Sequence, residues 1–133
     1  MAKAKKAKQL NFMMPDRIGL LSQISSAISD AKVNITASCA YGMEGRAYFM
    51  MITDSNAKAK KALAPFGVGI KEEEVISVEM PNKVGALQNV AKKIANARID
   101  IHYMYGTAGA GKTSICVFKT ADDKKAIKII NKQ

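Results

Sequence analysis

Residues 14–35 of this chain occur a second time, in altered form, as residues 80–101. At a constant offset of 66 the two segments share seven identical pairs in 22 positions. Self-similarity at a fixed offset means that one supersecondary unit is built twice. The identical pairs are Met14/Met80, Pro15/Pro81, Gly19/Gly85, Leu21/Leu87, Ile28/Ile94, Ala31/Ala97 and Ile35/Ile101.

Each copy begins with a strand followed by a helix. Residues 10–14 and 76–80 alternate in hydrophobicity, as a strand with one apolar face does. Proline ends each strand because it has no N–H to donate. Apolar residues then recur at three- and four-residue steps as far as Ala31 and Ala97, which predicts a one-sided helix. Asp16 and Asn82 are expected to be the N-caps of these helices.

The remainder of each copy continues the same alternation. Residues 33–39 and 99–105 are predicted second strands, and residues 48–53 and 115–120 are third strands that are apolar on both faces, as central strands are. Second helices begin near Ser55 and Asp122, and a short fourth strand is visible only in the first copy. This order predicts an α+β fold with two ferredoxin-like βαββαβ repeats, each an antiparallel sheet with helices on one face.

The charge distribution sets the expected domain limits. The net charge is +10, from 21 basic and 11 acidic residues, and four of the lysines lie within residues 1–8. We therefore expect a disordered basic tail at residues 1–8, a first repeat at 9–72 and a second repeat at 73–133 whose last strand is missing. The acidic run of residues 72–74 is expected to be a solvated linker.

Composition excludes several classes of protein. The two cysteines lack the spacing of a zinc site or a disulfide framework, so no structural metal or other cofactor is predicted. No run approaches the roughly 18 apolar residues of a membrane span. No apolar segment follows the lysines as it would in a signal peptide, so we expect a cytoplasmic protein without membrane contact.

A full match to the phosphate-binding pattern G-x-x-x-x-G-K-[ST] occurs at residues 106–113. That loop binds phosphates only between a strand and a helix, because the helix N-terminus supplies part of the site. Here residues 114–119 are predicted to be a strand, so we interpret the match as a glycine-rich hairpin turn. His102, the only histidine, has no triad partner at a readable position, and no catalytic residue is predicted.

The repeated turn between the first strand and the first helix is the best candidate site. The first N–H groups of a helix are unpaired and attract a carboxylate or phosphate. The oxygen atoms of Asp16 or Asn82 are suited to accept from an ammonium group, so the turn suits a zwitterion. Gly19 and Gly85 would let a ligand approach closely. Equally, these glycines would serve only to pack the helix against the strand.

The two turns, with residues 33–35 and 99–101, resemble the signature of the ACT domain family, D-x-P-G-x-L, then a helix, then G-I/V-N-I. The resemblance extends from residue 10 over nearly the whole chain. It implies a pair of regulatory domains, joined side by side, that bind an amino acid where their second strands meet. The family's proline before glycine is replaced by Ile18 and Val84, and Asp16 by Asn82 in the second copy, which weakens the expectation for the second pocket.

The resemblance also implies the ligand-binding residues. In the first pocket they are Asp16, Arg17, Ile18, Gly19, Leu20, Asn34 and Ile35, and in the second Asn82, Lys83, Val84, Gly85, Ala86, Asp100 and Ile101.

The expected function is that of a non-catalytic sensor of a small amino acid. Such a protein would form a homodimer, which would close the open sheet edge, and would act through a regulated partner protein or through a change of its oligomeric state. The alternatives are a basic nucleic-acid-binding protein and a scaffold with vestigial pockets. Nucleic-acid binding is disfavoured because RNA-binding sheets of this topology need exposed aromatic residues, and only Tyr48 qualifies.

Overall fold

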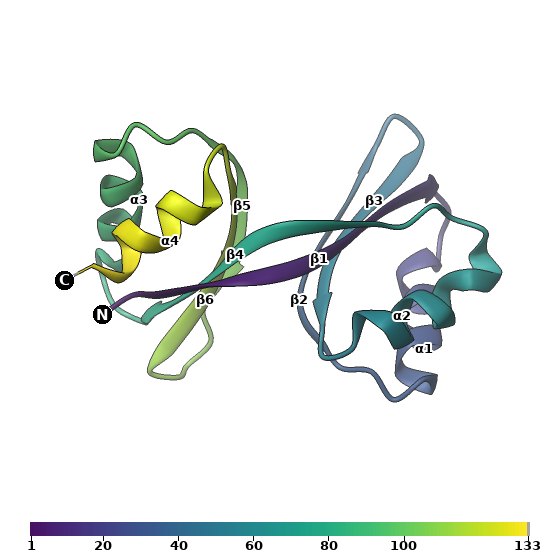
Figure 1. The fold of residues 1–133 in the computed structure, drawn as a ribbon. Helices are drawn as coiled ribbons and strands as arrows, with labels where there is room; N and C mark the ends of the chain where they lie inside the picture. Colours follow the sequence, from purple (N-terminus) through teal and green to yellow (C-terminus); the bar gives the residue numbers. More distant parts are fainter. Residues whose placement is uncertain (133) are drawn as a thin grey trace. The chain divides into compact units, whose positions relative to one another are not determined.

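The computed structural model describes residues 1–132, so the predicted end of the second repeat at residue 133 lies outside the described part. The predicted alternation of strands and helices is confirmed (Figure 1). The elements are β1 (Lys3–Pro15), α1 (Leu20–Asp30), β2 (Ile35–Met43), β3 (Arg46–Thr53), α2 (Asn56–Leu63), the short 3-10 helix η1 (Ala64–Phe66), β4 (Lys71–Pro81), α3 (Ala86–Asn96), β5 (Ile101–Thr107), β6 (Thr113–Thr120) and α4 (Asp123–Asn131).

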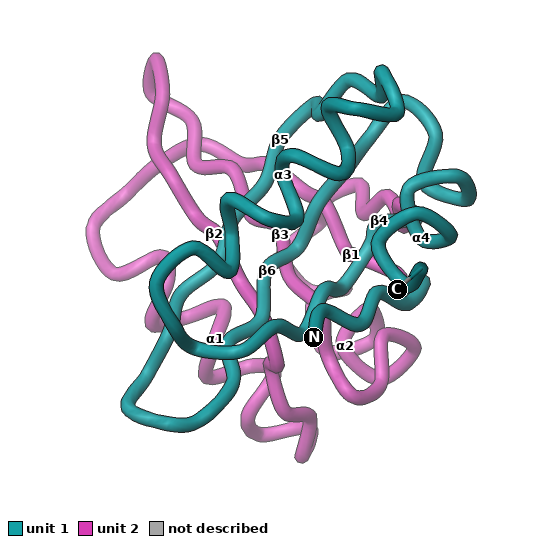
Figure 2. Tube along the Cα trace, turned by 90° about the vertical axis from the view of Figure 1, so that its left-hand side faces the viewer, with its two compact units in different colours: residues 1–7, 74–133 teal, residues 8–73 magenta. Residues whose placement is uncertain are grey.

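The chain divides into two compact units, coloured separately in Figure 2. Unit 2 consists of residues 8–73, and unit 1 combines residues 1–7 with the chain from Glu74 onward. The hydrogen-bonded strand order is β2-β3-β1-β4-β6-β5. Unit 2 therefore has the order β2-β3-β1-β4 and unit 1 the order β1-β4-β6-β5, with β3 and β6 in the predicted central positions. Each is a ferredoxin-like sheet carrying two helices, which confirms the predicted fold class.

The expected disordered tail is wrong, because β1 begins at Lys3. Residues 3–7 belong to unit 1, where β1 is the neighbour of β4 and takes the place of the strand that the second repeat lacks. Ala4 is only 7% exposed and is part of the unit 1 core, whereas Lys3 and Lys5 on either side of it are exposed. The alternation of alanine and lysine thus belongs to an edge strand, and the lysines discourage further pairing at that edge.

Asn131, the last residue of α4, fixes this strand in place. Its amide nitrogen donates to the carbonyl oxygen of Ala4 at 2.9 Å, and its amide oxygen accepts from the Ala4 N–H at 2.7 Å. The side-chain amide pairs with both backbone groups of Ala4, much as a neighbouring strand would. The contact joins residues 127 positions apart in the sequence.

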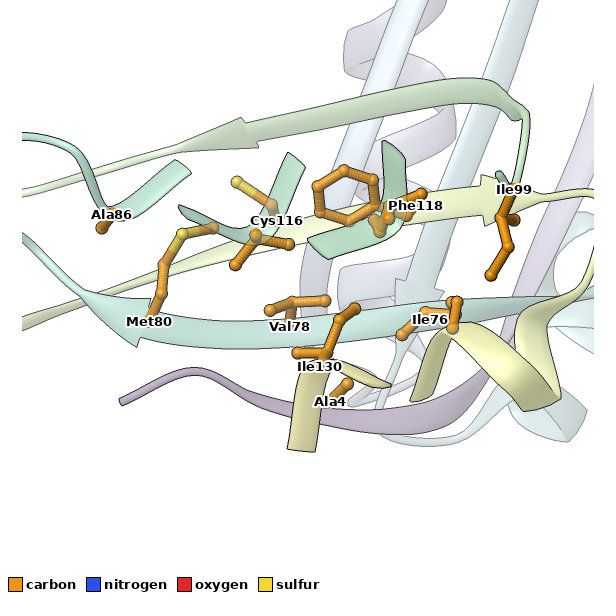
Figure 3. Packing of buried hydrophobic residues seen from close by; sticks show 12 residues of the cluster. Ala4, Ile76, Val78, Met80, Ala86, Ile99, Cys116, Phe118 and Ile130 are labelled. Atoms are coloured by element: carbon orange, nitrogen blue, oxygen red, sulfur yellow. The ribbon is translucent and has the colours of Figure 1, made fainter. Parts of the chain in front are cut away.

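Each unit has its own hydrophobic core between its sheet and its helices. In unit 1, Ala4 from β1 and Ile130 from α4 lie near Val78 of β4, and Phe118 fills the centre (Figure 3). In unit 2, the rings of Phe12 and Phe49 stack at 4.9 Å beneath α1 and α2. Because helices and strands bury their apolar faces separately in each unit, the repeat produces two cores of similar composition.

The second helices begin as the sequence predicts. Ser55 and Asp122 are the N-caps of α2 and α4, and their side chains accept from the N–H groups of Lys58 and Lys125. The acidic run at residues 72–74, however, is not a linker, because β4 starts at Lys71. Within residues 1–132 no helix combines the length and hydrophobicity needed to span a membrane.

Candidate functional site

The two repeated turns share one backbone geometry. Gly19 and Gly85 have φ angles of 86° each and are the N-caps of α1 and α3. The prediction that Asp16 and Asn82 cap these helices is therefore wrong, because the helices begin one residue after the glycines and neither has a side-chain cap. A Cβ at either glycine would meet nothing within 4 Å. Glycine is thus needed for its left-handed backbone and not for close packing.

In unit 2 the turn borders a cavity of about 290 Å³. The turn and the first residues of α1 form one wall, and the far end of β2 with the start of β3 forms the other. The lining residues are Asp16, Arg17, Gly19, Leu20, Leu21, Ser22, Ala40, Tyr41, Gly42, Ala47 and Phe49. Four of the seven predicted first-pocket residues therefore lie together, around a space whose volume is just below the range of about 300–1,000 Å³ typical of small-molecule sites.

Asp16 is the one carboxylate of this cavity. Its side chain has no hydrogen-bond partner among residues 1–132, and its backbone N–H donates to Gly45 at 2.9 Å. Gly42 makes room for it, because a Cβ at residue 42 would lie 3.2 Å from Oδ2 of Asp16. The Arg17 guanidinium donates to the side-chain oxygen of Gln23 on the first turn of α1. The site thus combines an unpaired anion with the N-terminal end of a helix.

Three predicted residues of the first pocket lie outside this cavity. Ile18 is fully exposed, at 102%. Asn34 and Ile35 lie at the opposite end of β2, where the Asn34 N–H donates to the carboxylate of Asp54 and Ile35 packs on the core. Sequence reasoning missed the β2 and β3 residues that line the cavity. The clearest available signal was Gly42, whose neighbours in the predicted hairpin face the turn.

In unit 1 the equivalent turn is hydrogen-bonded to the loop between β5 and β6. The amide nitrogen of Asn82 donates to the carbonyl oxygens of Gly109 at 2.8 Å and Gly111 at 2.9 Å. A carboxylate in this position has no proton to donate and would face two acceptors. The difference between Asp16 and Asn82 therefore changes which groups the side chain can bind.

The other predicted residues of the second pocket are dispersed. Gly85 caps α3, Val84 is fully exposed at 102%, and Lys83 and Ala86 line a different cavity, described below. Asp100 and Ile101 lie at the start of β5, where the Asp100 carbonyl accepts from the Ala121 N–H and Ile101 packs on the core.

The glycine-rich motif is a hairpin loop, as the sequence predicts. It connects β5 to β6, so no helix follows it. Gly106 lies opposite Cys116 in the β5–β6 ladder, and a Cβ at Gly106 would collide with the Cys116 sulfur. Gly106 is therefore required for the packing of the core. Cys116 itself is buried, and burial raises the pKa of its thiol.

Among the described residues, no three His, Cys, Asp or Glu side chains lie close enough to hold an ion. The Nε2 atom of His102 lies 4.0 Å from a carboxylate oxygen of Asp100, and both side chains are at least half exposed.

Comparisons with known proteins agree with this architecture. The profile of the family described as an ACT domain pair matches residues 5–133. Protein BT0572 from Bacteroides thetaiotaomicron is 25% identical, with a TM-score of 0.86 over 95% of this chain and 87% of that one. The ligand-free regulatory subunit of aspartate kinase from Thermus thermophilus has a TM-score of 0.68 at 12% identity, over 97% and 93% of the two chains.

A third structure has a similar fold. A putative C-terminal regulatory domain of aspartate kinase from Porphyromonas gingivalis has a TM-score of 0.63 at 10% identity, over 98% of this chain and 93% of that one. A search of curated proteins finds no match. The repeated turn, the two ferredoxin-like units and the profile match together show that the chain belongs to the ACT domain pair family.

Proposed function

We propose that this chain is a non-catalytic regulatory protein that binds a small amino acid at the turn of unit 2. The observation that carries the proposal is the Asp16 carboxylate, which has no partner in the described chain and borders a cavity at the start of α1.

The chemistry of the cavity suits a zwitterion. The Leu20 N–H donates to the carbonyl oxygen of Arg17 at 3.3 Å, but the next two N–H groups of α1, those of Leu21 and Ser22, have no acceptor in the described chain and suit an α-carboxylate. The Asp16 carboxylate suits the α-ammonium group, and such charge-assisted bonds are stronger than neutral ones. Leu20 and Phe49 form an apolar part of the cavity wall. The cavity volume of about 290 Å³ favours an amino acid with a small side chain.

Unit 1 is proposed not to bind an amino acid in the same way. Asn82 offers no charge for the ammonium group, and its amide is already bonded to the carbonyls of Gly109 and Gly111. One amino acid per chain is therefore expected.

A second copy of the chain would complete the site. The strand order leaves β2 at one end of the sheet, and its sequence from Ile35 to Met43 has no charged residue or proline to block pairing. Antiparallel pairing of two β2 strands would bring Asn34 and Ile35 of one copy beside Tyr41 of the other. The same pairing would also explain why two apolar side chains are exposed in the single chain, Ile18 fully and Leu21 at 61%. We therefore propose a homodimer with its amino-acid sites at the seam.

Regulation would follow from binding linkage. A ligand at 100 times its Kd stabilises the form that binds it by about 2.7 kcal/mol. Because the proposed protein has no catalytic part, this energy would act on a partner protein or on the dimer. We place this action in the cytoplasm, on the basis of two free cysteines.

Nucleic-acid binding is not favoured by the structure. Tyr48, the one aromatic residue expected to stack on a base, is stacked on Tyr41 at 5.1 Å. The four lysines near the N-terminus all lie on the strand β1 and not on a loose tail.

A thermal-shift screen of the twenty amino acids at millimolar concentration tests the proposal. We expect at least one to raise the Tm, and we expect the ligand-induced rise to vanish in Asp16→Asn, which keeps the shape and removes the charge. Asn82→Asp is the matched control and should keep the rise. A screen without any hit, or a hit that survives Asp16→Asn, would contradict the proposed site.

The dimer has its own test. Sedimentation of the wild type and of Ile18→Asp should show a dimer that weakens in the variant, because a charge would be placed against the second copy. Leu87→Asp in unit 1 is the control and should not change the oligomeric state. A monomeric wild type at high concentration would rule out the seam.

A further inference from the structure

Unit 1 contains a cavity of about 430 Å³ that the amino-acid site does not use. It lies along α3, between this helix and Met1 and Ala2, which lead into β1. Its floor is apolar and is formed by Met80, Ala86 and Val90, each no more than 9% exposed. Figure 3 shows Met80 and Ala86 at the same end of the unit 1 core.

In unit 2 the chain that leads into β4 packs against the core. There, the residues that lead into the edge strand β4 include Phe66, Val68 and Ile70, and all three pack against the core. In unit 1 the residues that lead into the edge strand are Met1 and Ala2, and only Ala2 packs against the core. The cavity of unit 1 therefore lies beside the small side chain of Ala2, over a floor whose three residues are buried.

The charge of the helix residues at these positions also differs between the two copies of the repeat. At the offset of 66, Ser26, Ala27 and Asp30 of α1 correspond to Lys92, Lys93 and Asn96 of α3, and all three α3 residues line the cavity. Two positive charges are gained and one negative charge is lost. No acidic residue is among the described residues that line the cavity.

The lysines are placed to receive an anion. Lys93 donates to the carbonyl oxygens of Ile130 at 3.2 Å and Lys132 at 3.0 Å, which holds its ammonium group between α3 and the end of α4. The side-chain ammonium groups of Lys92 and Lys83 have no partner within the described chain. An ammonium-bearing ligand would find no counter-charge here, in contrast to the cavity that contains Asp16.

We propose that this cavity binds a small aliphatic carboxylate without an ammonium group. Its hydrocarbon part would lie in the cavity against Met80, Ala86 and Val90. Its carboxylate would lie near Lys92 and Lys93. The chain would then carry two sites of opposite preference, one for a zwitterion and one for a simple acid.

An NMR titration of the full chain with octanoate tests this assignment. We expect saturable binding of one octanoate, with shifts in the amides of α3 and of the start of β1. Octanol, the neutral analogue, should bind about fivefold more weakly or worse, because it lacks the attraction of exposed lysines. Octylammonium should not bind at the site.

Variants locate the site. Lys92→Ser with Asn96→Asp restores the residues of the first copy and should weaken octanoate about fivefold or more. Ala2→Leu should fill the cavity and abolish the shifts. Ser26→Lys in α1 is the matched control and should change nothing, and Asp16→Asn should leave octanoate binding intact, which separates this site from the amino-acid site.

Three results would overturn the assignment. The first is a linear, non-saturating response to octanoate. The second is equal affinity for octanoate and octanol. The third is unchanged octanoate affinity in the Lys92→Ser/Asn96→Asp variant. The comparison of the two ligands uses only the wild-type chain, so it holds even if a variant fails to fold.

Discussion

The turn at residues 15–19 and its copy at residues 81–85 have the same backbone and different side-chain roles. In both, the N–H of the residue after proline donates across the hairpin at 2.9 Å, and the helix starts after a glycine with φ of 86°. Asp16 is left without a partner, whereas Asn82 binds two carbonyl oxygens. Glycine and proline preserve the backbone, so one side chain can change the chemistry without changing the fold.

A second pair of positions shows the same pattern. The carbonyl oxygen of Lys8 accepts from the amide of Asn56 at 3.1 Å. The equivalent carbonyl, that of Glu74, accepts instead from Lys119 at 3.0 Å, which also contacts the Asp123 carboxylate. Asp123 occupies the place of Asn56 and cannot donate, so a lysine supplies the missing donor. The two units meet the same backbone requirement with different residues.

The largest expected effect on stability concerns the edge strand of unit 1, which residues 3–7 form. Deletion of residues 1–7 should destabilise unit 1 by about 3 kcal/mol or more, because it exposes the core beside Ala4 and leaves the Asn131 amide and β4 backbone groups unpaired. Unit 2 should be largely unaffected. Hydrogen exchange would show faster exchange in β4, β6 and α4 than in β3 and α1.

Lys3→Gln with Lys5→Gln is the matched control for that deletion. Both lysines are exposed, so the free energy of unfolding should change by less than about 0.5 kcal/mol. Unchanged exchange in unit 1 after the deletion would mean that residues 3–7 are not part of its sheet.

The two N-cap glycines should respond alike. Gly19→Ala and Gly85→Ala should each cost about 1 to 2 kcal/mol, because a Cβ is strained at positive φ. Denaturant unfolding measures both. Gly109→Ala is the control, since Gly109 has open space around it and no positive φ. A large cost at only one of the two N-caps would show that their turns are not equivalent.

Exchange of the polar residue should separate the two turns. Asn82→Asp should cost about 1 kcal/mol, because the carboxylate would face two carbonyl oxygens that it cannot bind. Asp16→Asn should be close to neutral in the absence of ligand. The amide signals of residues 109–111 should broaden or shift only in Asn82→Asp. The loop-binding role of Asn82 would be excluded if they did not move.

The cysteines provide the smallest difference. Cys116 is 7% exposed and burial raises the pKa of its thiol, so less of it is thiolate at neutral pH. Cys39 is partly exposed on β2. Alkylation followed by mass spectrometry should label Cys39 first, and Cys116 only when unit 1 opens. Equal labelling rates in the folded protein would contradict the description of the unit 1 core.

Local patterns in the sequence determined most of this protein. The offset of 66, the strand and helix spacing and the prolines predicted two ferredoxin-like repeats, and the absence of a helix after residues 106–113 correctly predicted a hairpin. Asp16, Arg17, Gly19 and Leu20 border one cavity because they are near neighbours in the sequence, and their role in binding is a proposal. These features depend on residues close together in the chain, whose periodicity is visible without any tertiary contact.

Tertiary structure decided the rest. Residues 3–7 have the composition of a solvated tail, and only their pairing in unit 1, with Asn131 far along the chain, makes them a strand. The cavity beside Asp16 includes Tyr41 and Phe49 because strand pairing brings the ends of β2 and β3 against the turn. Likewise, the left-handed backbone at Gly19, and not the side chain of Asp16, starts α1. In the first two cases the deciding contact joins segments that no local pattern connects, whereas the start of α1 depends on the local backbone of Gly19.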